Sequence, residues 1–302
     1  MAQAPVPAPP PLRIVVPVGP GGSSDGVARL LAERMALVLR RPIVVENRPG
    51  GTGRIAVEAM RAAAPGGVVL VAPIALVVTA PIAFAKWPYQ PHDLAPVAQL
   101  SSFDYAFAVG AQSGIRTFAD FVAWARANAA ASHFAGVGNG SVPHFAGLLI
   151  ARDAGFTTSF VPYAEIGKLE ADLAGGHVAS AVAATSDIMA LHRSGRLRVL
   201  ATTGRTRAIP DVPTLRELGY PALEIAGWNA LFAHPRLPAA DIEALSRAAN
   251  EALRDPAVVG KMRDAGLVPT GSTPSELAAI IARDIALWTP VIRASGFVPD
   301  GP

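Results

Sequence analysis

One segment near the amino terminus decides the fold: residues 13–26, which read RIVVPVGPGGSSDG. Its β-branched start, Arg13–Val16, is typical of a buried strand. The glycines that follow suit a tight turn, and apolar residues at helical spacing over 25–40 predict an amphipathic helix. The segment therefore predicts a strand, a glycine-rich turn and a helix, the opening of a βαβ unit.

The same alternation continues along the chain. Further strands are predicted at 43–45, 68–72, 133–137, 157–162, 178–183 and 197–202. Helices are predicted near 54–63, at 117–129 and 143–153, between the later strands, and at 239–253, 256–265 and 274–294. Repeated βαβ alternation predicts an α/β fold, with mainly parallel sheets flanked by helices on both faces.

Two extended apolar segments predict how the chain divides. Residues 103–109 and 223–233 are each flanked by glycine or proline. If both cross between lobes, they form a two-strand hinge that suits closure on a ligand. The predicted parts are lobe 1 at 11–105 plus 228–302, lobe 2 at 106–227, and a proline-rich amino-terminal tail at 1–10.

Composition excludes several classes of protein. The 302 residues are 51% hydrophobic and carry a net charge of only +3, which argues against intrinsic disorder. The absence of cysteine excludes disulfides, thiolate nucleophiles and cysteine-ligated zinc. The pI is about 9.6, but the arginines are dispersed and no basic stripe with interleaved aromatics appears, so we expect no nucleic-acid partner. No His/Asp/Glu cluster has metal-ligand spacing, and we expect neither a metal nor a cofactor.

Two segments bear on membranes and export. Residues 68–85 form an apolar run long enough to suggest a membrane span, but Pro73 and Pro81 interrupt it and favour a strand followed by a short buried helix. The amino terminus lacks the basic and apolar regions of a signal peptide. Met1–Ala4 followed by prolines is also typical of a mature exported protein restarted with methionine, and on that interpretation we expect a periplasmic protein whose signal peptide has been removed.

The turn after the first strand is the first candidate site. Glycines over Gly21–Asp25 let the backbone approach a ligand, and a helix start presents free N–H groups that favour an anion. A plain turn capped by Ser23, Ser24 or Asp25 is the alternative. Residues 22–26 also fit G-x-S-x-G, the nucleophile elbow of α/β serine hydrolases, with Ser24 as nucleophile. No HGGG-type segment accompanies this elbow, and His177, His192 and His234 have no obvious acidic partner.

Residues 136–141 repeat the first site's logic in the middle of the chain. A strand again passes through a glycine turn into a helix, with His144 in the first turn. Two such helix starts facing each other across a cleft would clamp a dianion, or the one carboxylate of a smaller acid, whereas His144 alone is also typical of a structural cap. Residues 51–56 match the dinucleotide fingerprint G-x-G-x-x-A, but no acidic residue ends the next strand, so a tight turn that lets the following helix pack closely is favoured.

An ordered set of motifs resembles one known family. The chain is similar to the substrate-binding proteins of tripartite tricarboxylate transporters, the Bug family. The matching segments run almost end to end: residues 13–17 and 20–25, VVENRPG at 44–50, DLAPV at 93–97, GNGS at 138–141 with His144, VPY at 161–163, LAGG at 173–176, GRLR at 195–198, PDVPT at 210–214, Gly227-Trp228, and Pro238 before the last helices.

The resemblance implies a two-lobed periplasmic binding protein fold, type II-like. It implies a monomer, without catalytic residues, that captures a small carboxylate and delivers it to membrane transporter subunits. In that family the carboxylate is held largely by backbone N–H groups and bridging waters, here from Gly21–Asp25 and Gly138–Ser141 with His144. A ligand sensor for a signalling partner is the alternative role.

Four departures from the family pattern concern the ligand. Small polar residues after the third strand are replaced by the apolar run 73–77, and an Asp-Asn pair by Ala183-Ala184. Pro143 removes one N–H from the second helix start, and Ala164-Glu165 replaces a lysine or glycine. We therefore expect a ligand with one anchored carboxylate and an apolar or aromatic body, rather than citrate or an amino acid. The expected ligand-binding residues are Pro20, Gly21, Gly22, Ser23, Ser24, Asp25, Ile74, Ala75, Val137, Gly138, Asn139, Gly140, Ser141, His144, Tyr163, Ala184, Thr185, Asp187 and Trp228.

Overall fold

The computed structural model describes residues 10–50, 53–84 and 86–298. Most of the predicted tail, and the first two residues of the dinucleotide-like motif, lie outside these ranges. The strands are β1 Leu12–Val16, β2 Ile43–Asn47, β3 Val68–Pro73, β4 Ala95–Gly110, β5 His133–Val137, β6 Ser159–Tyr163, β7 Ser180–Ala184, β8 Leu197–Thr202, β9 Ala226–Ala233 and β10 Val268–Pro269. The α-helices are α1 Ser23–Leu39, α2 Arg54–Ala62, α3 Ala80–Ala83, α4 Phe118–Ala127, α5 Val142–Ala154, α6 Ile166–Gly175, α7 Thr185–Arg193, α8 Ala239–Ala252, α9 Pro256–Asp264 and α10 Pro274–Ala294.

The strands form one curled, mixed sheet in the order β2-β1-β3-β9-β4-β7-β5-β6, and β8 and β10 also pair with β4. Two groups are parallel, β2-β1-β3 and β6-β5-β7. Between them, β9 and β4 run antiparallel to their neighbours. The predicted parallel cores are therefore present, and they are joined by antiparallel strands.

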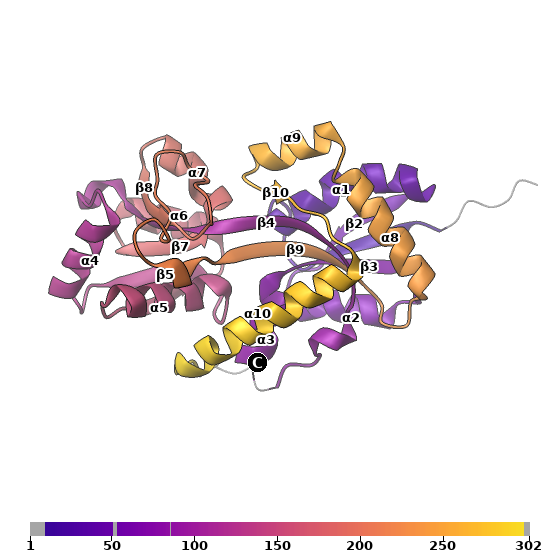
Figure 1. Ribbon diagram of the computed structural model, residues 1–302, viewed down its shortest axis with the longest axis horizontal. Helices are drawn as coiled ribbons and strands as arrows, with labels where there is room; N and C mark the ends of the chain where they lie inside the picture. The colour runs from indigo at the N-terminus through magenta and orange to yellow at the C-terminus, as the bar shows by residue number, and fades with distance from the viewer. Residues whose placement is uncertain (1–9, 51–52, 85, 299–302) are drawn as a thin grey trace, which may run out of the picture.

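The fold is the predicted two-lobed α/β arrangement (Figure 1). We use lobe 1 for β1–β3, β9 and β10 with α1–α3 and α8–α10, and lobe 2 for β5–β8 with α4–α7. Strand β4 belongs to both lobes, since its first half pairs with β9 and its second half with β7 and β8. Helix α10 packs on β4 and reaches α5 in lobe 2. The residue boundaries given above for the lobes stay a prediction.

The first crossing strand is longer than expected, the second is shorter, at Ala226–Ala233 instead of 223–233, and the two are linked by hydrogen bonds. Strand β4 begins at Ala95 rather than near Phe103. Its first half contains Pro96, which is unusual inside a strand, and pairs with β9 through local register shifts. Thr203 joins β4 to the second crossing segment, which leads into β9. The Thr203 N–H donates to the Tyr105 carbonyl at 2.8 Å, and its hydroxyl donates to the Ile225 carbonyl at 2.6 Å. These bonds tie the two crossing segments together at the hinge.

The described part of the apolar run, residues 68–84, folds within lobe 1. It supplies β3, a π-helical turn at Ala75–Thr79 and the short helix α3. Within the described ranges, none of the helices combines the length and apolar character needed to cross a bilayer. Gly53 lies at the start of α2 with φ +90°, and a Cβ there would overlap the Leu76 side chain. The described part of the dinucleotide-like motif thus forms a close packing contact.

Candidate functional site

The amino terminus of α1 presents backbone N–H groups that no side chain caps. Strand β1 ends at Val16, and the chain turns through Gly21, whose φ of +91° favours glycine, into a helix whose N-cap is Gly22. No side chain caps this end. The N–H groups of a helix's first turn have no intrahelical acceptor and carry the positive end of the helix dipole. The first turn can therefore bind an anion through its backbone.

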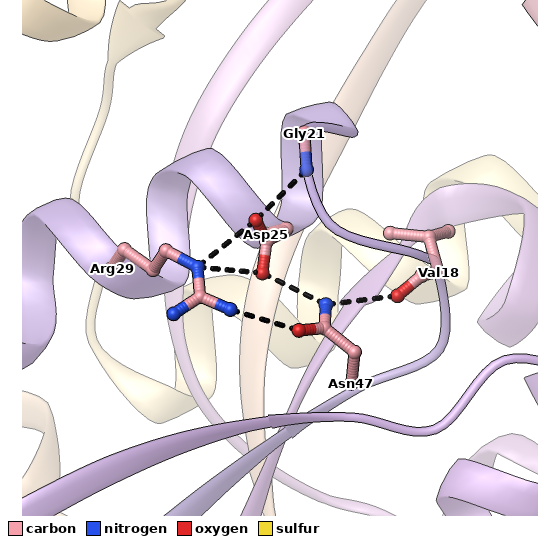
Figure 2. Close-up of polar contacts among 5 residues, drawn as sticks. All are labelled: Val18, Gly21, Asp25, Arg29 and Asn47. Carbon is pink, nitrogen blue, oxygen red and sulfur yellow. Dashed lines mark hydrogen bonds and ion pairs between the residues drawn. The ribbon is translucent and has the colours of Figure 1, made fainter.

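The Asp25 carboxylate is used within the turn itself (Figure 2). It accepts the Gly21 N–H at 3.0 Å, Arg29 Nε at 3.0 and 3.1 Å, and Asn47 Nδ2 at 2.8 Å. Burial alone would raise the pKa of Asp25, but these hydrogen bonds and the Arg29 charge outweigh burial and lower the pKa. Asp25 is therefore an ionised group that holds the turn.

Ser24 points into lobe 1. Its hydroxyl donates to the side-chain oxygen of Asn229 at 2.5 Å, and Asn229 Nδ2 donates to Ser101 at 3.2 Å. All three side chains are buried. An activated serine needs a base that takes its proton. The Ser24 proton is directed at an amide oxygen rather than at a histidine, which does not favour the hydrolase alternative.

The second glycine turn, at the carboxyl end of β5, largely satisfies its own donors. The Gly138 N–H donates to the Tyr163 carbonyl at 3.0 Å, and the Gly140 N–H donates to His144 Nδ1 at 3.2 Å. The Ser141 hydroxyl accepts the His144 N–H at 3.5 Å, and Pro143 has no N–H. The start of α5 is therefore a poorer anion site than that of α1.

The His144 ring is part of an aromatic cluster. It stacks on Phe160 with ring centroids 3.9 Å apart and meets Phe297 edge-on at 5.3 Å. The residue is 7% exposed, and burial lowers the pKa of His144 to about 4. The ring is therefore neutral at pH 7. The hydrogen bond that it accepts from the Gly140 N–H agrees with the structural capping role, one of the two roles that the sequence allowed for His144.

Lobe 1 covers this second turn. Thr79 Oγ1 donates to the Gly140 carbonyl at 3.2 Å, across the two lobes. A Cβ at Gly140 would lie 3.1 Å from the Phe84 ring and 3.4 Å from the Phe297 ring. Thr79, Phe84 and Phe297 were not among the residues predicted from the sequence. Their proximity depends on how the lobes meet, and apolar residues after a helix carry no signal of that contact.

The ends of β3 and β7 complete this edge of the sheet. Ile74 is buried, and Ala75 is half-buried at the start of the π-helical turn. Helix α7 starts at Thr185 after Ala184, without a side-chain cap. Asp187 in its first turn is exposed, yet the surrounding protein raises the pKa of Asp187 to about 6, and nearby Glu170 adds to the shift. Above that pH it places a negative charge in lobe 2.

A second contact between the lobes lies beside α7. A Cβ at Gly266 would lie 3.0 Å from the Cβ of Ser186 in α7. Next to this contact is a cavity of about 330 Å³, lined by Thr185 and Ser186 from lobe 2 and by residues 263–268 from lobe 1. The volume is at the lower end of the range for small-molecule sites.

The remaining expected residues are dispersed. The Tyr163 hydroxyl donates to Asp172 at 2.8 Å, and burial together with this bond raises the pKa of Tyr163 to about 12. Trp228 is buried, and its indole N–H donates to Asp284 of α10 at 2.8 Å. These polar atoms already have protein partners. Pro20 is exposed in the first turn, and Val137 and Asn139 are half-buried at the end of β5.

Comparisons with known sequences agree along nearly the whole chain. A family model described as the tripartite tricarboxylate transporter family receptor matches residues 27–297. The protein BugT of Bordetella pertussis is 32% identical over 297 residues, covering 95% of this chain and 89% of BugT.

Solved structures agree with the fold. MatC from Rhodopseudomonas palustris, solved with bound malate, is 28% identical with a TM-score of 0.83, covering 93% of this chain and 98% of MatC. A protein from R. palustris solved with adipate is 25% identical with a TM-score of 0.88, covering 95% of this chain and 98% of that one. Both neighbours were thus solved with a dicarboxylate.

Proposed function

Because this chain belongs to the tripartite tricarboxylate transporter family of receptors, we propose that it is a periplasmic solute-binding protein without catalytic activity. It captures a small organic carboxylate between its lobes and delivers that ligand to the membrane subunits of a tripartite transporter. The malate and adipate bound by two structural neighbours support a carboxylate as the ligand class.

The uncapped start of α1 is the observation that carries the proposal. Its first residues, Ser23 and Ser24, present backbone N–H groups at the positive end of a 17-residue helix. The turn before them supplies no side-chain oxygen that competes for these donors. A ligand carboxylate would satisfy them, at a charge-assisted gain of about 1.5–3 kcal/mol for each hydrogen bond.

The surroundings of the second turn favour a ligand body without a second negative charge. The second turn is covered by Phe84 and Phe297, and the neutral His144 stacks beside it. Asp187 lies at the start of α7, at the same edge of the sheet, and is mostly ionised at pH 7. Apolar rings and a like charge both disfavour a distal carboxylate. We therefore propose one anchored carboxylate and an apolar or aromatic body.

A thermal-shift panel tests this ligand class. Benzoate, phenylacetate and octanoate should raise the melting temperature more than malate, adipate, citrate or aspartate. Stabilisation by citrate or aspartate, without stabilisation by the monocarboxylates, would overturn the apolar-body proposal. Stabilisation by no carboxylate at all would overturn the solute-binding proposal for this site.

Two variants of one residue test the backbone contact. Ser23 is the first helical residue, where proline is tolerated, and Gly22 before it is extended at φ −71° and ψ 161°. Ser23→Pro therefore removes one N–H while keeping the helix, and ligand affinity should fall about 10- to 100-fold. Ser23→Ala removes only the hydroxyl and should bind more tightly than Ser23→Pro. Equal affinities for the two variants in calorimetry would contradict backbone binding.

A further inference from the structure

Asn47 is the last residue of β2, and both polar atoms of its side-chain amide form hydrogen bonds with the β1–α1 turn and α1 (Figure 2). Its Nδ2 group donates to the Val18 carbonyl at 3.0 Å and to Asp25 Oδ1 at 2.8 Å. Its Oδ1 accepts from Arg29 Nη2 at 2.8 Å. One side chain thus joins the first residues of the turn to the first and second turns of α1.

Packing holds only the first part of this turn, where Val18 packs against the core of lobe 1. Space is open around the positions where a Cβ would stand on Gly19 and Gly21, and Gly21 has a positive φ. Glycine backbone is the most flexible in the chain, and it orders only where other contacts constrain it. The glycine part of the turn is constrained by hydrogen bonds, namely the bond from Gly21 to Asp25 and the two bonds donated by Asn47.

The same network controls the charge at the helix start. A buried carboxylate in the first turn of α1 would repel a ligand carboxylate bound at that turn. Both Asp25 oxygens, however, are within 3.1 Å of Arg29 Nε, and they also accept from Gly21 and Asn47. The negative charge of ionised Asp25 is therefore balanced by Arg29, and its oxygens are already bonded within the turn, which makes it a positioning residue rather than a ligand contact.

We propose that Asn47 is the positioning residue of the α1 carboxylate site. It fixes the turn so that the Ser23 and Ser24 N–H groups converge on one point, and it keeps Asp25 paired with Arg29. This inference rests on the proposed function for its ligand. The position of the turn is independent of that function, and it can be measured in the unliganded protein.

The test uses two variants of Asn47 and one neighbouring control. Asn47→Ala removes all three hydrogen bonds. Asn47→Asp keeps the shape but replaces the Nδ2 donor with a second carboxylate facing Asp25. Arg48→Gln changes the adjacent residue, whose side chain pairs with Glu46. Hydrogen exchange is measured without ligand, and benzoate and adipate affinities are measured by calorimetry.

We expect amide exchange over residues 19–28 to increase in both Asn47 variants and to stay at the wild-type rate over α5. We expect the affinity for whichever probe binds the wild type to fall about 10-fold or more in both variants, and to remain unchanged in Arg48→Gln. Wild-type affinity in Asn47→Asp would show that only side-chain shape matters, and would overturn the inference. Unchanged exchange over 19–28 would also overturn it, whatever the ligand. If neither probe binds the wild type while exchange rises as expected, the proposed ligand class fails and the positioning role of Asn47 stands.

Discussion

The neutral, buried ring of His144 predicts a specific dependence of stability on pH. Burial lowers the pKa of His144 to about 4, compared with about 6.5 in an unfolded chain. Between these values the unfolded chain binds a proton that the folded protein does not, so stability rises with pH. The contribution of neutral His144 to the free energy of unfolding is complete above pH 6.5 and is lost as the pH falls to 4. At about 1.4 kcal/mol per pH unit, it amounts to about 3 kcal/mol.

His144→Phe removes the titrating group and keeps a ring against Phe160. At pH 7 the variant should be less stable by about 1–3 kcal/mol, because the buried Gly140 N–H loses its acceptor. As pH falls from 7 to 4, the wild type should lose about 3 kcal/mol relative to the variant. The stability difference should therefore shrink steadily, and approach zero or change sign near pH 4.

Urea unfolding followed by tryptophan fluorescence at pH 7, 5.5 and 4 measures this difference. Ile150→Val, also on α5 and fully buried, is the control. It should cost about 0.5–1.5 kcal/mol at every pH, since it carries no titrating group. A difference between wild type and His144→Phe that stays constant across this range would refute a buried neutral histidine.

Three further predictions concern other buried or capping contacts. Trp228→Phe leaves one Asp284 oxygen without its indole donor and should lower the free energy of unfolding by about 1.5–3 kcal/mol in urea titrations; an unchanged midpoint would contradict the importance of that bond. Gly147→Ala would overlap the Phe134 ring and cost about 1–3 kcal/mol, and adding Phe134→Leu should recover part of the loss in thermal melts, whereas purely additive losses would argue against a clash. Thr117→Ala removes the N-cap hydroxyl of α4 and should cost about 1 kcal/mol by circular dichroism, while Thr117→Ser should cost less; equal costs would count against capping.

Local patterns predicted the elements well, because their signals lie within single segments. The helix expected over 25–40 is α1 at Ser23–Leu39, and the strand expected at 197–202 is β8. Strand β4 was expected only from Phe103, since Pro96 disfavours a strand interior. That proline is tolerated because the pairing with β9 shifts register beside it.

Contacts among the candidate site residues could not be predicted in the same way. Asn47 reaches Asp25 because β1 and β2 pair in parallel with Val16 opposite Asn47. Nothing in the sequence near either residue specifies that register. The cover that Phe297 forms over Gly140 likewise depends on α10 reaching lobe 2. Such contacts join residues far apart in the chain, so they follow from the packing of whole elements.

The sequence by itself determined the two-lobed α/β fold and the position of a helix start after β1, because apolar periodicity and glycine placement are local properties. The tertiary structure alone decided which polar groups remain free for a ligand. Asp25, His144 and Trp228 all have polar atoms suited to binding, and each is bonded to a protein partner. Among the described residues, the start of α1 keeps its donors because no side-chain hydrogen bond caps it. Hydrogen-bond saturation and burial depend on atoms that only folding brings together.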